Sequence, residues 1–258
     1  PQIRKRIFLF DSTLEIMDQK LQCKICGNID NNKIHIAQEM MFGFRDKFEY
    51  LECGQCGCVQ LINIPVDLAK YYPDNYYSFN KITYKYNPLK IFLKKQLIEC
   101  RVHKKNNLIG RLLSYIYPDA EDFYAWFEKL QLPFNAHVLD VGCGSGSLLL
   151  KFRKSGFTNV EGADPFIAKD IQYPGGVTIH KKLLVEVAGQ YDLIIFNHAF
   201  EHMPNQEEVL KQVFRLLKKG GCALVRIPIA GTYAWRTYGV NWVQLDAPRH
   251  FYLHTVAS

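Results

Sequence analysis

The sequence predicts an α/β fold: a mainly parallel sheet flanked by helices, preceded by a small cysteine-rich module. From His137 onward, short apolar segments alternate with amphipathic stretches across short connections, a pattern typical of parallel sheets. A glycine-rich turn at 142–146 joins the first apolar segment to the first amphipathic one. Two Cys-x-x-Cys pairs lie near the N-terminus and indicate a separate module.

The elements of the sheet follow from their patterns in chain order. Short apolar runs predict strands at 137–141, 160–163, 177–180, 191–196 and 222–227. The helix predicted at 148–155 begins at the glycine turn. A second helix, at 207–218, has one apolar face and is expected to end at Gly220-Gly221. Strands that alternate with helices in this way are expected to pair in parallel.

Composition and patterning divide the 258 residues into four regions. They are a lead-in at 1–20, a cysteine module at 21–62, a tyrosine-rich linker and helical region at 63–131, and the main α/β domain at 132–258. No apolar run approaches the about 18 residues that span a membrane, and the run near the N-terminus is too short for a signal peptide. We therefore expect no membrane span and a cytoplasmic location.

The net charge of +7 is concentrated in one segment. Between Lys81 and Arg111 basic residues recur and Glu99 is the one acid. Such a segment suits nucleic acid, an acidic membrane surface or a phosphorylated substrate. A solvated helical face is the simpler interpretation, and no aromatic-basic RNA-binding motif supports nucleic acid.

The glycine turn has the context of a ligand-binding loop, because it follows a strand and opens a helix. Glycines let the backbone turn sharply and approach a ligand, and the first amides of the helix offer unpaired donors. A dinucleotide-binding loop would carry its third glycine at position 147, where Ser147 stands. The glycines are instead Gly142, Gly144 and Gly146, with Asp140 before them.

An acid at the end of the next strand is the second expected part of such a site. Asp164 follows the strand at 160–163, about 20 residues beyond the glycine turn, where a carboxylate accepts hydrogen bonds from ribose hydroxyls. The alternative for Asp164-Pro165 is a simple turn or helix cap.

Asp-x-Gly-x-Gly-x-Gly at 140–146, with an apolar-Glu-His-apolar-Pro segment at 200–204, resembles class I S-adenosylmethionine (SAM) dependent methyltransferases. The resemblance implies a Rossmann-like class I methyltransferase sheet and SAM as cofactor. It also implies that the SAM contacts come from the glycine loop and the ends of the second and fourth strands: Asp140, Gly142, Cys143, Gly144, Gly146, Asp164, Pro165, Phe196 and Asn197. Little chain follows Ile227, so the sheet is expected to lack its last strands, or the domain to be truncated.

Two knuckles, Cys23-Lys-Ile-Cys26 and Cys53-Gly-Gln-Cys56, are each followed by glycine. Four thiolates make a closed tetrahedral zinc site with no open position for catalysis, so a structural zinc is expected. Free cysteines or a redox pair are the alternative, and Cys58 is not expected to be a ligand. With the tyrosine-rich stretch at 71–78, the module resembles that of deoxysugar C-methyltransferases, which implies a nucleotide-linked sugar as acceptor.

Methyl transfer to oxygen, or to carbon beside a carbonyl, needs a base, and histidine suits that task near neutral pH. His198 and His202 follow the fourth strand, at the carboxyl end of the sheet where ligands bind. His250 lies in a Pro-Arg-His element that related methyltransferases also carry. For His202 the alternative is packing at a helix start, and for the Pro-Arg-His element a structural turn with Arg249 in an ion pair.

The sequence therefore predicts an enzyme, a SAM-dependent methyltransferase that acts on a small molecule, a sugar or glycan precursor, at carbon or oxygen. The alternative is an RNA or protein methyltransferase that grips a macromolecule through the cysteine module and the basic segment. A domain that binds SAM without turnover is a third possibility. The absence of an Asn-Pro-Pro-Tyr-like motif after the fourth strand, where Phe196-Asn197 stand, disfavours N-methylation of bases.

Overall fold

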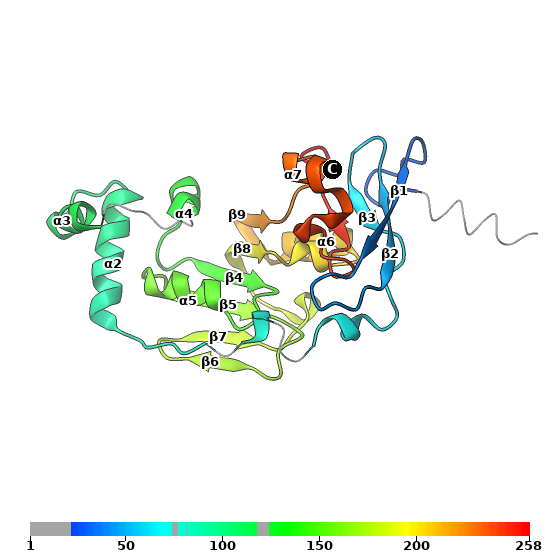
Figure 1. The fold of residues 1–258 in the computed structure, drawn as a ribbon. Coiled ribbons are helices and arrows are strands. Elements are labelled where there is room, and N and C mark those ends of the chain that lie inside the picture. Colours follow the sequence, from blue (N-terminus) through cyan, green and yellow to red (C-terminus); the bar gives the residue numbers. More distant parts are fainter. Residues whose placement is uncertain (1–21, 74–76, 81, 118–123) are drawn as a thin grey trace, which may run out of the picture. The chain divides into compact units, whose positions relative to one another are not determined.

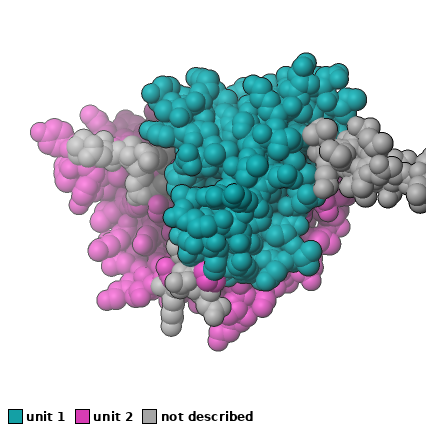
Figure 2. All heavy atoms as spheres, turned by 45° about the vertical axis from the view of Figure 1, so that its right-hand side comes forward, with its two compact units in different colours: residues 1–72, 228–258 teal, residues 73–227 magenta. Residues whose placement is uncertain are grey.

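The computed structural model describes residues 22–258 apart from 74–76, 81 and 118–123 (Figure 1). The lead-in predicted at 1–20 lies outside this range. Two compact units make up the chain: residues 73–227, and residues 1–72 together with 228–258 (Figure 2). The region assigned to the main domain from the sequence, 132–258, is thus divided between the two units.

Residues 73–227 form a six-stranded sheet in the order β6-β7-β5-β4-β8-β9. Its strands are β4 (His137–Val141), β5 (Asn159–Ala163), β6 (Ile171–Tyr173), β7 (Val177–His180), β8 (Tyr191–Asn197) and β9 (Leu217–Arg226). All neighbours pair in parallel except β6, which lies antiparallel to β7 at one edge. The chain starts at the central strand β4, extends the sheet to one side through β5 and β7, and then crosses to β8. The strand order therefore reverses between β4 and β8, the position where open α/β sheets bind ligands.

Both faces of this sheet are covered because its strands are apolar on both sides. The helices are α2 (Pro88–Arg101), α3 (Leu108–Ile116), α4 (Tyr124–Leu130), α5 (Ser147–Lys154) and α6 (Gln206–Leu216). Val138 of β4 belongs to one core cluster, with Ile98 of α2 and Phe152 of α5. Leu139, the next residue, belongs to the opposite cluster, with Val213 of α6. Consecutive residues of β4 thus pack on opposite faces, as the pleat requires.

The structure confirms the predicted α/β fold and differs from the sequence interpretation at one glycine pair. Gly220-Gly221 lies inside β9 and does not end the preceding helix, which stops at Leu216. Gly220 has φ +81°, and the pairing of β8 with β9 shifts register between Tyr191 and Leu193. The expectation that the pair caps the helix is therefore wrong: the glycines accommodate an irregularity at the start of the strand.

The other unit contains a four-stranded antiparallel sheet in the order β1-β2-β3-β10. Its elements are β1 (Lys33–Gln38), β2 (Lys47–Glu52), β3 (Val59–Leu61), the helix α7 (Tyr233–Tyr238) and β10 (Tyr252–Leu253). β10 pairs with β3 through Leu253 opposite Val59, so the end of the described chain completes the sheet of the cysteine module. The chain after β9 therefore adds its next strand, β10, to this sheet.

Arg249 holds the returning segment in place from a fully buried position. Its guanidinium donates to Asp246 Oδ2 at 2.9 Å, to Glu39 Oε1 at 3.1 Å and to the Tyr71 carbonyl at 3.2 Å. A buried guanidinium is tolerated only when its charge and donors are matched, as they are here. The geometry agrees with the structural interpretation of the Pro-Arg-His element, a turn with Arg249 in an ion pair.

Candidate functional site

The glycine loop between β4 and α5 needs glycine at all three positions. Gly142, Gly144 and Gly146 have φ of +70°, +53° and +83°, a region that other residues rarely adopt. A Cβ on Gly144 would lie 2.4 Å from the carbonyl oxygen of Ser78, and one on Gly146 would lie 2.6 Å from Ile179 Cδ1. The loop is therefore tightly packed on one side by its own unit and specific for glycine.

Asp164, at the end of β5, lies directly against this loop. Its Oδ2 accepts from the Gly144 amide at 2.8 Å and its Oδ1 from the Phe166 amide at 2.9 Å. The side chain is buried, with 4% of the residue exposed, and burial raises its pKa while the backbone donors lower it. The Ile167 amide is a further backbone donor beside this carboxylate. A carboxylate offers about four lone-pair sites, so Asp164 keeps acceptor capacity for a ligand. Pro165 stands in the turn that brings the Phe166 amide back to this carboxylate.

Asp140, on β4 just before the glycine loop, is a buried acid. Only 2% of it is exposed, and its Oδ1 has no hydrogen-bond partner in the part of the chain that the structure describes. Burial, assisted by the charge of Asp164, raises the pKa of Asp140 to about 8. A buried carboxyl oxygen without a donor is costly, so this position suits a cationic or hydrogen-bond-donating ligand group.

Cys143 completes the loop as a packing residue. Its sulfur lies in space that Gly162 of β5 leaves open, since a Cβ there would be 2.4 Å from Cys143 Sγ. Burial raises its pKa well above the ordinary value, which keeps the thiol neutral and unreactive. Cys143 can thus contribute its backbone to the loop while its side chain fills the core.

The segment after β8 brings His198 beside a buried acid that the sequence interpretation did not single out. His198 has φ +56°, and its amide donates to the Arg226 carbonyl at 2.9 Å. Its Nδ1 lies 3.5 Å from Glu201 Oε1, and Glu201 is fully buried in the short helix η4 (Phe200–His202). A carboxylate beside Nδ1 favours a ring orientation and a tautomer that carry the proton on this nitrogen. The sequence did contain a signal for the pairing of His198 with Glu201, because Glu201 is the acid of the Phe-Glu-His pattern at 200–202.

The other predicted residues of this segment are Phe196, Asn197 and His202. Phe196 is fully buried in the sheet core, and Asn197 Oδ1 accepts from Arg226 Nη1 at 3.2 Å. His202 is half-buried in η4, and its amide donates to the Ala199 carbonyl at 3.1 Å. The loop after β8 therefore places His198 and His202 close in the chain at the carboxyl edge of the sheet.

His250 belongs to the other unit and is nearly completely buried. Its Nδ1 lies 2.8 Å from the Gln244 carbonyl oxygen, which assigns the proton to Nδ1. Nε2 is then the atom that could accept a proton.

Ser78, in the short helix η2 (Tyr77–Phe79), is a further contact of the glycine loop that the sequence did not reveal. Its carbonyl accepts from the Ser145 amide at 3.0 Å and from Ser145 Oγ at 3.2 Å. The Tyr173 hydroxyl donates to the Ser145 carbonyl at 2.8 Å. The loop is thus held by segments that precede and follow it in the chain, which fixes its shape before any ligand binds.

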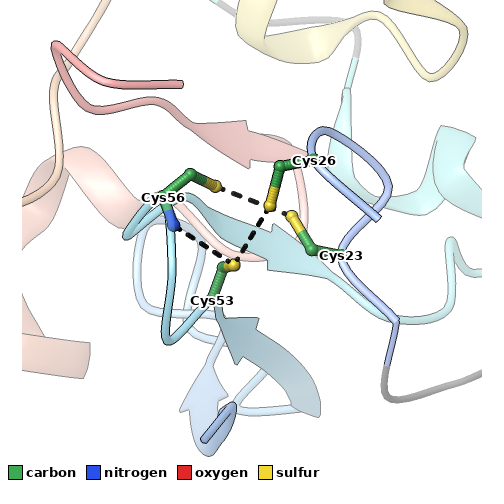
Figure 3. Close-up of side chains that lie close together, drawn as sticks. All are labelled: Cys23, Cys26, Cys53 and Cys56. Carbon is green, nitrogen blue, oxygen red and sulfur yellow. Dashed lines mark hydrogen bonds between the residues drawn. The ribbon is translucent and has the colours of Figure 1, made fainter. Parts of the chain in front are cut away.

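The four knuckle cysteines converge as the spacing predicts (Figure 3). Their sulfurs all lie within 4.8 Å of one another, with Cys23 and Cys56 at 3.7 Å and Cys26 and Cys53 at 3.5 Å. Four sulfurs at about 2.3 Å from a central zinc would be about 3.8 Å apart. The set therefore fits a tetrahedral metal ion with little movement.

Local backbone geometry explains how each knuckle aims its sulfurs. Gly27 and Gly57 have φ of +74° and +71°, and their amides donate to the carbonyls of Cys23 and Cys53 at 2.9 and 3.0 Å. The two knuckles therefore have the same turn. Cys58 lies outside the cluster, and burial raises the pKa of its thiol to about 12, which suits a packing residue.

A glycine-rich loop at the switch point of a parallel sheet, with a buried acid at the end of the neighbouring strand, defines a protein that binds a nucleoside-type ligand. The family described as "Methyltransferase domain" matches residues 113–258, more than half of the chain. The chain belongs to this family, and the prediction of a methyltransferase domain is confirmed.

Curated relatives match about half of the chain. The ubiquinone biosynthesis O-methyltransferase of Pseudomonas aeruginosa (strain UCBPP-PA14) is 33% identical over 139 residues, which cover 48% of this chain and 59% of that protein. The enzyme of the same name from Bordetella avium (strain 197N) is 31% identical over 148 residues, or 51% and 61% of the two chains. The matches thus span about three fifths of these relatives.

Similar solved structures include magnesium protoporphyrin IX methyltransferase from Synechocystis PCC 6803 with bound SAH, at 16% identity and a TM-score of 0.41, covering 73% of this chain and 82% of that one. A SAM-dependent methyltransferase from Mesorhizobium loti is 19% identical with a TM-score of 0.34, covering 42% and 54%. Among the described residues, no helix is long and apolar enough to cross a membrane.

Proposed function

We propose that the protein is a SAM-dependent methyltransferase. The observation that carries this proposal is Asp164, buried against the Gly144 amide with its remaining lone pairs available to the two ribose hydroxyls. When bound, SAM supplies a methyl group on a sulfonium, which an in-line nucleophile can take up. The residues of this chain bind and orient the donor and remove the acceptor's proton.

Asp140 supports the same ligand through a different group. The α-ammonium of SAM would give its buried Oδ1 the donor and the positive charge that the described residues do not supply. An anionic ligand group, or one without a hydrogen-bond donor, would leave this oxygen uncompensated. The pair Asp140 and Asp164 therefore favours a ligand with an ammonium at one end and a ribose at the other.

The raised pKa of Asp140 predicts how SAM affinity depends on pH. With a pKa of about 8 in the free protein, Asp140 is mostly protonated at neutral pH, and an ammonium ligand favours its ionised form. Binding then releases a proton, so affinity should rise with pH by up to about tenfold per unit between about pH 6 and pH 7.5. Titration calorimetry across this range measures the trend. Asp140→Asn should remove it, and an affinity that falls with pH in the unchanged protein would contradict this role.

We propose His198 as the base that deprotonates the acceptor, because Glu201 lies at its Nδ1 and leaves Nε2 for the acceptor. His198→Gln should lower kcat by about 10²–10⁴-fold and change the affinity for SAM little. His202→Gln and His250→Gln are the matched controls, since both were also candidates from the sequence. If kcat falls in one of the controls and not in His198→Gln, the histidine changed in that control is the base and His198 is not.

The acceptor is proposed to be a small molecule. Relatives named as ubiquinone biosynthesis O-methyltransferases favour an oxygen acceptor. The likeness of the cysteine module to deoxysugar C-methyltransferases favours a nucleotide-linked sugar. Mass spectrometry of nucleotide-sugars and phenols incubated with the protein and SAM should reveal a product heavier by one methylene group.

The alternative of an RNA or protein acceptor is favoured by one observation, the basic segment that includes α2 and α3. RNA and a protein extract belong in the same assay. Product in these samples alone would overturn the small-molecule proposal and leave the SAM-dependent activity intact.

We further propose that the cysteine cluster holds a structural zinc ion. The sulfur separations and the paired knuckle turns support it, and four thiolates leave no coordination position for a substrate. None of the eight cysteines, all of them among the described residues, forms a disulfide, which favours a reducing compartment such as the cytoplasm.

A further inference from the structure

A cavity of about 200 Å³ lies where α2 begins and α5 ends, within the unit of residues 73–227. Figure 1 shows these two helices beside each other. The lining residues come from the segment before α2, its first two turns and the last residue of α5: Tyr84, Lys85, Asn87, Lys90, Ile91, Lys94 and Lys154.

The lining contains four lysines and no acid. Lys85, Lys90 and Lys154 form no ion pair within the described ranges, whereas Lys104 and Lys105, beyond the other end of α2, pair with Glu128 and Glu99. Uncompensated ammonium groups around one concave surface attract an anion. A solvated helical face, the simpler interpretation of the basic segment, does not explain why these lysines line one cavity.

Tyr84 gives a second and independent indication of a ligand. The residue is 9% exposed, and its buried hydroxyl has no hydrogen-bond partner among the residues that the structure describes. Lys154 Nζ lies 5.5 Å from the centre of its ring. A buried hydroxyl without an acceptor is costly, and an anion that reaches it from the cavity would relieve this cost.

The start of α2 adds to the positive electrostatic potential of the lysines at this cavity. Asn87 caps the helix by accepting from the Lys90 amide at 3.0 Å, and Pro88 occupies the first helical position. The positive end of the helix dipole therefore points toward the lining residues at this turn. An anion here would meet fixed dipoles as well as mobile lysines.

The cavity is remote from the proposed methyl-donor site. α5 begins at Ser147, directly after the glycine loop, and ends at Lys154, about 12 Å further on at 1.5 Å per residue. The loop is at the carboxyl edge of the sheet, and the end of α5 lies toward the opposite edge. An anion in the cavity would thus be separate from SAM.

We propose that this cavity binds a phosphate group. Lysines act as compact point charges that suit the tetrahedral oxygens of phosphate, and Tyr84 supplies one directed donor. The phosphate can belong to a free phosphate ester or to a lipid headgroup, which share this chemistry. Exposed Leu89 and Phe92 on the same turns of α2 would lie next to such a headgroup.

Titration calorimetry of the full chain with pyrophosphate, at low and moderate salt, tests the proposal. Binding is expected to weaken with salt. Lys90→Gln and Tyr84→Phe should each weaken it by about three- to tenfold. Lys219→Gln changes an exposed lysine near the start of β9, is the matched control and should change nothing. Tyr84→Phe should fold normally, with a melting temperature equal to or above that of the unchanged protein, because it removes an unpaired hydroxyl.

Vesicles of phosphatidylcholine with or without phosphatidylglycerol form the second arm. Binding only to the anionic vesicles, lost in Lys90→Gln, would identify the lipid headgroup as the source. Binding of pyrophosphate with the same variant dependence would identify a soluble phosphate ester. Failure of the unchanged protein to bind either probe, or binding that both cavity variants leave unchanged, would overturn the proposal without affecting the SAM-dependent activity.

Discussion

Replacing Cys53 by serine is expected to remove the bound metal and unfold the unit that contains the four-stranded sheet. Three of the four knuckle cysteines, Cys23, Cys53 and Cys56, belong to the buried core of this unit. A structural zinc site contributes about 10–16 kcal/mol, which is comparable to or larger than the about 5–15 kcal/mol stability of a whole domain. Zinc content by elemental mass spectrometry and amide hydrogen exchange over β1–β3 measure the two effects.

Cys58→Ala is the matched control for this experiment. Cys58 is as buried as Cys23 and Cys53 but lies outside the cluster of four. We expect this variant to retain one zinc per chain and to lose about 1 kcal/mol from the small cavity that it creates. Equal zinc loss in both variants, or a fully protected β1–β3 sheet after chelation, would contradict a structural zinc.

Asp164→Ala is expected to weaken SAM binding by about 10²–10⁴-fold. Two hydrogen bonds from ribose hydroxyls to a carboxylate contribute about 1.5–3 kcal/mol each, and the Gly144 amide also loses its acceptor. Asp164→Asn keeps one carbonyl acceptor, so its affinity for SAM should lie between that of the unchanged protein and that of Asp164→Ala. Calorimetric titration with SAM gives the dissociation constants.

An exposed acid of the same unit provides the control for Asp164. Asp170 accepts from the Lys181 amide at 2.8 Å, away from the glycine loop. Asp170→Ala should bind SAM as the unchanged protein does. A variant at Asp164 that retains full affinity would show that the buried acid serves the loop and not the ribose.

Much of the fold could be predicted because its parallel strands are short, apolar on both faces and separated by helices. The edge strand β6 could not, since Ile171–Tyr173 is only half-buried and leaves no strong pattern. The pairing of β10 with β3 joins residues far apart in the sequence through a strand of two residues. No local propensity encodes such a contact.

The site shows the same division. Asp140, Gly144 and Asp164 stand at spacings fixed by the strand-loop-helix unit, so the sequence could place them together. Glu201 was missed because its position depends on tertiary structure. The left-handed backbone of His198 and the packing of η4 bury Glu201 beside His198, and neither can be inferred from local sequence. Ser78 was missed because only its backbone carbonyl contacts the loop, and a backbone contact leaves no residue-type signature.

The most direct test of the central claim is a crystal structure of the full chain with S-adenosylhomocysteine, the product form of the donor. The ribose hydroxyls are expected within hydrogen-bond distance of both Asp164 oxygens, and the ammonium near Asp140 Oδ1. Occupancy at another site, or a glycine loop that stays empty when the ligand saturates the crystal, would contradict the assignment of this loop to the methyl donor.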